Sequence, residues 1–299
     1  MPGVIEVQGL RKAYGKRRGI VDVGFSVAEG EVFGFLGPNG AGKTTTIRCM
    51  LGFIRPDGGR ATVLGLDAWA DAPALHRRMA YLSGDPRYWG ELTAERFFDF
   101  TGDLRGLPRG AWRPLAERLG ADVSVPIRKL SHGNRQKVGL VQVFMGTEPV
   151  LVMDEPTTGL DPLMQREFLA LVAEARAAGR TVFLSSHNLG EAERACDRVA
   201  IIREGRIVAV EAVEALPQRH VHAVDLVLAA PPAAGTFALP DVDVVAAAGA
   251  DVRLLVRGDL NPLLRRLATL EVRGMAVSTP DLEDLFMAYY EGPPEGGAP

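Results

Sequence analysis

The residues best suited to chemistry form a glycine-rich stretch near the N-terminus. Two glycines stand with four residues between them and are followed at once by lysine and threonine, so that the stretch reads Gly37-Pro38-Asn39-Gly40-Ala41-Gly42-Lys43-Thr44-Thr45. In such a loop several backbone N–H groups converge on phosphate oxygens, and the N-terminus of the next helix adds a partial positive charge. We expect the Lys43 ammonium to reach the outer phosphates and the Thr44 hydroxyl to ligate Mg²⁺.

The flanks of this loop support the prediction. The apolar run at residues 32–36 has the length of a strand, and residues 46–51 can continue as a helix. Lys43 is the only lysine between Lys16 and Lys129, and a compact ammonium fits a closed phosphate loop better than a planar guanidinium does. The alternative is a glycine-rich turn that happens to precede a helix, and the match at every fixed position in this context argues against it.

Two acidic residues follow a second apolar strand. Residues 150–153 predict the strand, and Asp154 and Glu155 come directly after it. Ligands of parallel α/β sheets lie at the carboxyl ends of the strands, where the phosphate loop is also expected. Adjacent carboxylates point in different directions, so we expect Asp154 to hold Mg²⁺ and Glu155 to polarise the water that attacks the γ-phosphate. The alternative is a strand that ends at the surface in two solvated acids.

Three further residues are candidates because of their places in the chain. His187 follows a predicted strand, where imidazole can donate a hydrogen bond to a γ-phosphate oxygen; an incidental histidine is the alternative. Ser131 and Gly133 lie at the start of a predicted helix and form a second anion site. Since the Lys43 loop already holds one nucleotide, this second site suggests a phosphate presented by another subunit. The alternative is a Ser131 N-cap without a ligand.

The hydrophobic pattern predicts one large α/β domain at residues 1–212, with a helical insertion at about 84–146. Strands are expected at residues 4–7, 23–27, 61–64, 79–82, 150–153, 181–185 and 199–202, with residues 10–15 in a loop between the first two. Helices are expected at residues 93–103, 111–119, 134–145 and 162–178, the last with Asp161 as N-cap, Pro162 at its first position and Gly179 after its end.

A change in composition predicts a second, smaller domain. A linker is expected around residues 211–219. Strands at residues 221–228 and 252–256, a helix opening at Asn261-Pro262 and a last helix after Thr279-Pro280 predict an α+β domain at residues 220–291. The tail at residues 292–299 is too rich in glycine and proline to pack, so we expect it to be disordered.

Composition argues against several classes of protein. A net charge of −3 over 299 residues gives no general attraction to nucleic acid or anionic lipid. The two cysteines lack the spacing of a metal site or a disulfide framework. No signal peptide and no uncharged apolar run long enough to span a bilayer are evident. We expect a soluble, cytoplasmic chain, for which any membrane role requires a partner.

Taken together, these residues resemble the ATP-binding subunit of an ABC transporter. The order matches the family over residues 4–210: phosphate loop, signature at residues 130–134, the two acids, Gly159-Leu160-Asp161-Pro162 and then His187. The resemblance implies a P-loop NTPase fold with a mixed sheet, antiparallel N-terminal strands and a helical insertion. It also implies that the chain binds ATP with Mg²⁺ and hydrolyses the ATP.

The resemblance further implies an assembly. Two subunits, identical or related, would dimerise head to tail, so that Ser131 and Gly133 of one close on the γ-phosphate held by Lys43 of the other, with Asp161 at the seam. Tyr14 would stack on adenine, although an exposed tyrosine without a role is the alternative.

Residues 220–291 look like the appendage of the subfamily that energises two-component bacterial exporters of drugs and antibiotics, on the strength of Pro280 to Phe286 and Tyr289-Tyr290. We therefore expect an integral membrane permease as partner, a place on the inner face of the cell membrane, and export rather than import. Most aromatic side chains of residues 88–100 are expected in the core of the helical insertion, and the resemblance implies a groove there for a cytoplasmic helix of that permease. The rival functions are a soluble ABC-type ATPase acting on nucleic acid or ribosomes, and a small-molecule kinase.

Three positions depart from the family pattern. Gly84 stands where the family usually has a glutamine, so coupling there would depend on Asp85 or on the backbone. In the signature, His132 replaces a glycine and Asn134 a glutamine. His132 adds a titratable group near an anion site, and we expect the His132→Gly substitution to alter the pH profile of ATP hydrolysis.

Overall fold

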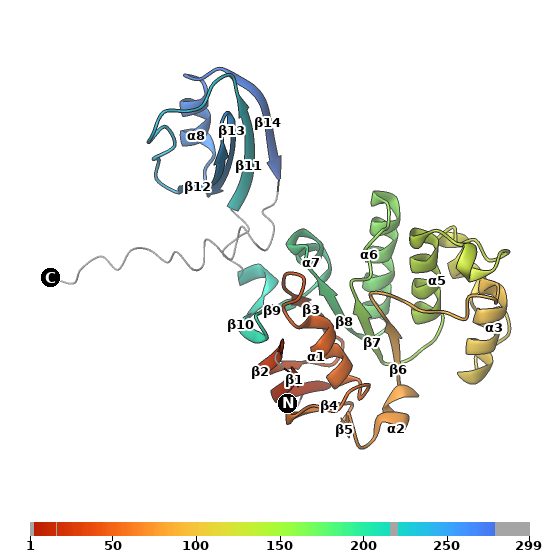
Figure 1. The fold of residues 1–299 in the computed structure, drawn as a ribbon. Coiled ribbons are helices and arrows are strands. Elements are labelled where there is room, and N and C mark those ends of the chain that lie inside the picture. Colours follow the sequence, from red (N-terminus) through yellow and green to blue (C-terminus); the bar gives the residue numbers. More distant parts are fainter. Residues whose placement is uncertain (1–2, 16, 216–220, 279–299) are drawn as a thin grey trace. The chain divides into compact units, whose positions relative to one another are not determined.

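The computed structural model describes residues 3–15, 17–215 and 221–278. These form two compact units (Figure 1). One takes in the described residues up to Ser186 and those from Glu191 to Val213, and the other takes in His187–Gly190 and the described residues from Glu214 onward.

The first unit is built on a ten-stranded sheet with the order β5-β4-β1-β2-β10-β9-β3-β8-β7-β6. Its parallel part runs from β9 to β6 and places the carboxyl ends of five strands on one edge. These strands are β3 (Val32–Leu36), β6 (Met79–Leu82), β7 (Val150–Asp154), β8 (Thr181–Ser186) and β9 (Arg198–Arg203). Every residue of β3, β7 and β8 is buried, and their apolar residues accordingly follow one another without alternation, over all of β3, residues 150–153 of β7 and residues 182–184 of β8.

The antiparallel part contains β1 (Ile5–Tyr14), β2 (Arg17–Val27), β4 (Gly58–Val63) and β5 (Leu66–Asp67). The prediction that residues 10–15 form a loop was wrong, because β1 continues through Tyr14. Its pairing with β2 is irregular beyond Val7, and Asp57 receives hydrogen bonds of 2.8 Å from both Lys12 Nζ and Ala13 N. These partners are distant in sequence, so the local pattern carried no sign of a strand.

β10 (Arg206–Ala212) joins the two parts of the sheet, since it pairs with β9 and meets β2. It occupies the start of the segment predicted as a linker, and η2 (Val213–Ala215) follows. The predicted linker was therefore wrong at its start. Residues of β10 pair antiparallel with β9, and the composition of the segment gives no sign of these main-chain partners.

Helices cover both faces of the sheet (Figure 1). Alternate residues of β7 belong to two different cores, Leu151 and Met153 to one and Val150 and Val152 to the other. Between β6 and β7 lie α3, α4, η1 and α5, as predicted for the helical insertion. The helices are α1 (Lys43–Met50), α2 (Ala72–His76), α3 (Ala94–Leu104), α4 (Arg113–Arg118), η1 (Ile127–Lys129), α5 (His132–Phe144), α6 (Pro162–Ala177) and α7 (Leu189–Ala195).

The second unit is an antiparallel sheet of order β12-β13-β11-β14 with one helix. Leu263 and Leu267 of the helix pack into the core on one face of this sheet. Its elements are β11 (Val221–Leu228), β12 (Val242–Ala248), β13 (Asp251–Arg257), α8 (Asn261–Leu267) and β14 (Val272–Ser278). The α+β prediction is confirmed, but β12 and β14 were missed because most of their residues are exposed and neither strand has a sustained run of buried apolar side chains. The predicted last helix and the tail lie outside the described residues.

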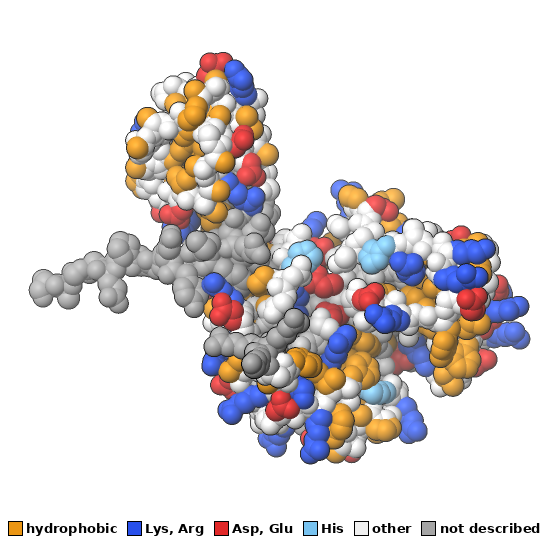
Figure 2. Space-filling view, viewed as in Figure 1, with side chains coloured by type: hydrophobic (Ala, Val, Ile, Leu, Met, Phe, Trp, Pro, Cys, Tyr) orange, Lys and Arg blue, Asp and Glu red, His pale blue; other side chains and the backbone are white. Residues whose placement is uncertain are grey.

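Among the residues that the structure describes, no helix combines the length and apolar character needed to cross a membrane. Figure 2 shows that charged side chains of both signs are interspersed over the visible face of the molecule.

Candidate nucleotide-binding site

The glycine-rich loop connects β3 to α1 and borders a cavity of about 200 Å³. Gly42, the N-cap of α1, has a φ of 113°, which side chains rarely permit, and a Cβ there would lie 2.8 Å from Ile20 Cγ2. A Cβ on Gly37 would lie 2.4 Å from the Ile202 main-chain oxygen. Both glycines are therefore required by the close approach of neighbouring strands. The cavity is lined by Tyr14, Gly19, Pro38, Asn39, Gly40, Gly42, Lys43, Thr44, Thr45 and Glu155.

Lys43 is almost fully buried, with 6% of its surface exposed. Its Nζ donates to Gly37 O at 2.5 Å and Pro38 O at 3.3 Å, and lies 3.0 Å from Glu155 Oε1. A buried ammonium needs such partners. The Lys43 ammonium is thus held beside the cavity, where phosphate oxygens of a nucleotide can replace the Gly37 and Pro38 carbonyl oxygens as its hydrogen-bond acceptors.

Asp154 ends β7 with its carboxylate buried and fully engaged. Oδ2 accepts a hydrogen bond of 2.8 Å from Thr44 Oγ1, and Oδ1 accepts one of 2.5 Å from Ser185 Oγ on β8. Adjacent ligands of octahedral Mg²⁺, at 2.0–2.1 Å from the metal, lie about 2.9 Å apart. The Thr44 and Asp154 oxygens therefore fit two neighbouring positions in such a shell.

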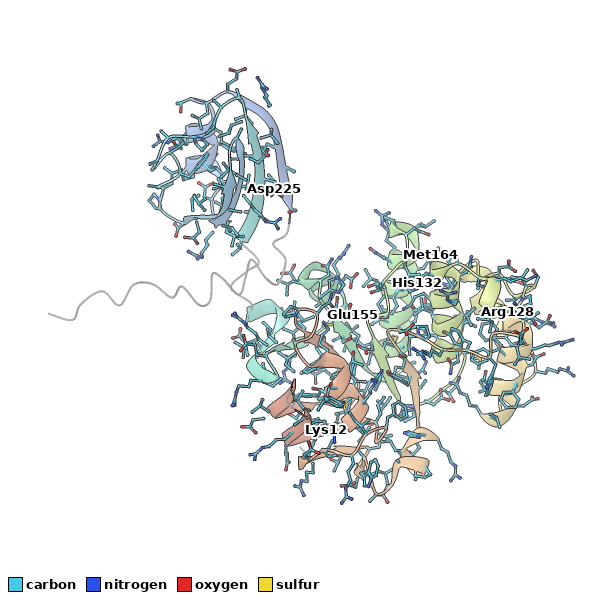
Figure 3. All side chains as sticks on the ribbon, viewed as in Figure 1. Lys12, Arg128, His132, Glu155, Met164 and Asp225 are labelled. Carbon is cyan, nitrogen blue, oxygen red and sulfur yellow. The ribbon has the colours of Figure 1, made fainter. Side chains whose placement is uncertain are left out.

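Glu155 follows at the end of β7 and is labelled in Figure 3. Its φ of 49° is left-handed, an uncommon conformation for a residue with a side chain. Its N–H donates to Ser185 Oγ at 3.0 Å, and its carbonyl oxygen accepts from Gln136 Nε2 and from Thr158 N, each at 3.3 Å. The main chain is therefore held on both sides of this residue.

Nearby groups contribute to the electrostatics of the site. On the neighbouring strand β6, burial raises the pKa of Tyr81, a hydrogen bond with Ser83 partly offsets the rise, and the Asp154 charge adds to it. A Cβ on Gly84 would lie 3.3 Å from Asp154 O, so this departure from the family pattern borders the candidate Mg²⁺ ligand. The Asp85 side chain is 84% exposed and lies 3.7 Å from Arg87 Nε.

The remaining candidates lie on two loops that pack together within the chain. Ser131 is the N-cap of α5 and accepts a hydrogen bond of 3.2 Å from Asn134 N. Asp161 caps α6 through two hydrogen bonds of 3.0 Å. A Cβ on Gly159 would lie 2.4 Å from the His132 ring, and one on Gly133 would lie 2.9 Å from Gly159 O. The signature loop and the loop before α6 are therefore in contact.

The structure thus brings together the phosphate loop, Tyr14, Asp154 and Glu155. Tyr14 is 46% exposed and lines the cavity. Ser131 and Asp161 do not line it among the described residues. His187 follows β8 directly and its side chain is exposed.

Two residues that hold the site were missed. Ser185 contacts both acids, and its place beside a strand end was the only signal available. Gln136 reaches the Glu155 main chain from α5, and nothing in the sequence pointed to it.

A buried lysine in a glycine-rich loop, facing a hydroxyl and two carboxylates at the carboxyl edge of a parallel sheet, defines a P-loop nucleotide-binding domain. Residues 20–158 match the family model described as "ABC transporter". The chain belongs to the ABC transporter family and contains its ATP-binding domain, as the sequence resemblance indicated.

Relatives agree with this assignment. The chain is 36% identical over 212 residues to the Nod factor export ATP-binding protein I of Ralstonia nicotianae, a match that covers 69% of this chain and 66% of that protein. It is 32% identical to the bacitracin transport ATP-binding protein BcrA of Bacillus licheniformis, covering 70% and 69%. The chain thus spans about two thirds of their length. A solved ATP-binding subunit of an ABC transporter is 33% identical, with a TM-score of 0.65 over 72% of this chain and 92% of that one.

Proposed function

We propose that this chain is the ATP-hydrolysing subunit of an ABC exporter, and that it powers transport through a separate integral membrane permease. The observation that carries the proposal is the convergence of Lys43, Thr44 and Glu155 on one cavity at the carboxyl edge of the sheet, with Asp154 hydrogen-bonded to Thr44. The name of the Ralstonia nicotianae relative, an export protein, supports the direction, and that of the Bacillus licheniformis relative supports transport. They give no support to a role on nucleic acid.

Each residue has a role set by its position. The backbone of residues 37–45 and Lys43 bind and orient the phosphates, and Tyr14 stacks on the base. Thr44 and Asp154 would hold Mg²⁺, and the ion would supply positive charge beside the phosphate oxygens. Glu155 accepts the proton of the attacking water, and His187 donates to the γ-phosphate. Glu155 is ion-paired with Lys43, so a bound nucleotide must draw Lys43 away from Glu155 before Glu155 can accept a proton from water.

The dimer is proposed because the signature residues do not line the nucleotide cavity of their own chain. Ser131, Gly133 and Asp161 form a contiguous surface with His132 and Gly159, and that surface does not line the cavity of its own chain. We propose that it closes on the nucleotide of a second subunit, identical or related. The N-terminus of α5 and its Ser131 hydroxyl suit a γ-phosphate.

The permease would dock on the helical insertion, with the chain on the inner face of the cell membrane. Trp89, Phe100 and Leu104 are 56%, 44% and 72% exposed, although side chains of this type are usually buried. Trp89 and Phe100 contact each other edge to face at 5.2 Å. Figure 2 shows hydrophobic side chains gathered over this part of the molecule, at the right of the view. Such a patch suits an apolar helix face.

The Glu155→Gln substitution tests the proposal. We expect ATP binding to be retained, hydrolysis to fall by about 10²-fold or more, and an ATP-dependent dimer to accumulate. Full hydrolysis by this variant would contradict the role of Glu155. Co-purification with a polytopic membrane protein tests the transport assignment, and a phosphorylated small-molecule product in place of free phosphate would indicate a kinase instead.

A further inference from the structure

The left-handed main chain at Glu155 needs support from its surroundings. A φ of 49° is unfavourable for glutamate, and such conformations persist only where neighbouring groups hold them. On the N-terminal side this support is Ser185, whose Oγ accepts the Glu155 N–H at 3.0 Å. On the C-terminal side the Glu155 carbonyl is held by Thr158 N, within the same loop, and by Gln136.

Gln136 reaches the C-terminal side of Glu155 from another element. It lies on α5 with 1% of its surface exposed. Its Nε2 donates to Pro156 O at 2.8 Å and to Glu155 O at 3.3 Å, so one amide group spans two consecutive carbonyl groups. Turning the amide over would place its oxygen against both carbonyl oxygens, so the assignment of the donor is secure.

The oxygen of the Gln136 amide makes no hydrogen bond among the described residues. Gln136 Oε1 is buried and has no hydrogen-bond partner among the described residues. A buried polar atom without a partner lowers stability, whereas an unbranched apolar side chain of similar length would fill the same space without that cost. Packing alone therefore does not favour glutamine here, and what this residue contributes is its donor.

We propose that Gln136 is a positioning residue for Glu155. From α5 it holds the Glu155-Pro156 main chain, while Ser185 holds the same residue from β8. The two together maintain the left-handed main chain from which the Glu155 side chain reaches the cavity. Because α5 begins at the Ser131 cap, the orientation of Glu155 is tied to the helix that carries the signature. The effect of Gln136 on ATP hydrolysis rests on the proposed function, whereas its effect on the Glu155 main chain does not.

The test compares Gln136→Met with Gln165→Met in the full chain. Gln165 is a matched control, since its Nε2 also donates to a loop carbonyl, Leu160 O at 3.3 Å, but not to Glu155. For Gln136→Met we expect kcat to fall by about 10- to 100-fold, because a small misplacement of a reacting group has an effect of this size. The Kd for ATP should stay within about twofold. The Tm should fall by no more than about 4 °C, because the Pro156 carbonyl loses its donor while the buried, unpartnered Gln136 Oε1 is removed. Gln165→Met should retain the wild-type kcat.

Two further measurements separate positioning from a merely structural role. In a Glu155→Gln background, Gln136→Met should cause no additional loss of hydrolysis, and an equal loss there would overturn the proposal. If Gln136→Met does not fold, Gln136→Glu serves in its place. Its carboxyl group can donate only when it is protonated, so its deficit relative to wild type should grow as the pH is raised and the acid loses its proton. A deficit that does not change with pH would also overturn the proposal.

A crystal structure of Gln136→Met gives a readout that needs no activity. We expect Glu155 to leave the left-handed region, and a φ that stays near 49° would refute the positioning role. If the wild type does not hydrolyse ATP, the proposed function fails, and this structure still decides whether Gln136 holds Glu155.

Discussion

Replacement of Ser185 by alanine should destabilise the first unit far more than the loss of one surface hydroxyl would. Ser185 is fully buried, donates to the Asp154 carboxylate at 2.5 Å and accepts the Glu155 N–H at 3.0 Å. A hydrogen bond to a charged group contributes about 1.5–3 kcal/mol, and a buried N–H left without a partner costs about 1–3 kcal/mol. Together these terms lower the free energy of unfolding by about 4 kcal/mol.

The prediction can be measured without nucleotide. For a unit of this size, 1 kcal/mol corresponds to a shift in Tm of about 2–4 °C, so Ser185→Ala should lower the Tm of the first unit by about 10 °C in calorimetry. Thr181→Val is the matched control: its hydroxyl is buried on the same strand and accepts one neutral hydrogen bond, from Gly30 N at 2.9 Å. Its Tm should fall by about 2–4 °C, from a loss near 1 kcal/mol. Equal shifts in the two variants would refute the reasoning that Ser185 holds both acids.

Three further predictions concern other parts of the first unit. Gly159→Ala should lower the Tm, because φ is +77° and the new Cβ would lie 2.4 Å from the His132 ring; in a His132→Gly background only the backbone strain, about 1–2 kcal/mol, should remain, and equal losses in both backgrounds would contradict the contact. Burial alone would raise the pKa of Glu148, but hydrogen bonds and charge from Arg105 hold it below its usual value of 4.5. The stability that ionised Glu148 adds is present above pH 4.5 and is lost as the pH falls through the lower, folded-state pKa. The free energies of unfolding of wild type and Glu148→Gln should therefore converge in acid, and a difference that does not change with pH would contradict this role of Arg105. The Cβ of Gly84→Gln would lie 3.3 Å from the Asp154 main-chain oxygen at the end of β7, so this variant should fold once the two segments move apart by a few tenths of an ångström. Its side chain should lower the Mg²⁺ concentration needed for half-maximal hydrolysis; an unchanged Mg²⁺ titration would show that it adds no ligand.

The sequence alone was sufficient for the phosphate loop, the two acids and the helices around them. These features are local: glycines at fixed spacing, an apolar run before them and a helix after them are all specified within a few residues of Lys43. The start of α6 is also specified locally, because Asp161 as N-cap and Pro162 at the first position predict the helix that the structure contains. The strands of the parallel sheet were equally clear, because burial on both faces leaves an unbroken apolar run.

Only the tertiary structure decided which groups hold the two acids in place. Ser185 is 31 residues from Asp154, and Gln136 is 19 residues from Glu155, so sheet order and helix packing bring them together. The left-handed main chain at Glu155 likewise has no local signature, since no glycine marks it. Strand β10 and the far end of β1 also depended on distant partners. Local spacing therefore determines which residues can do the chemistry, whereas non-local hydrogen bonds determine the directions in which those residues point.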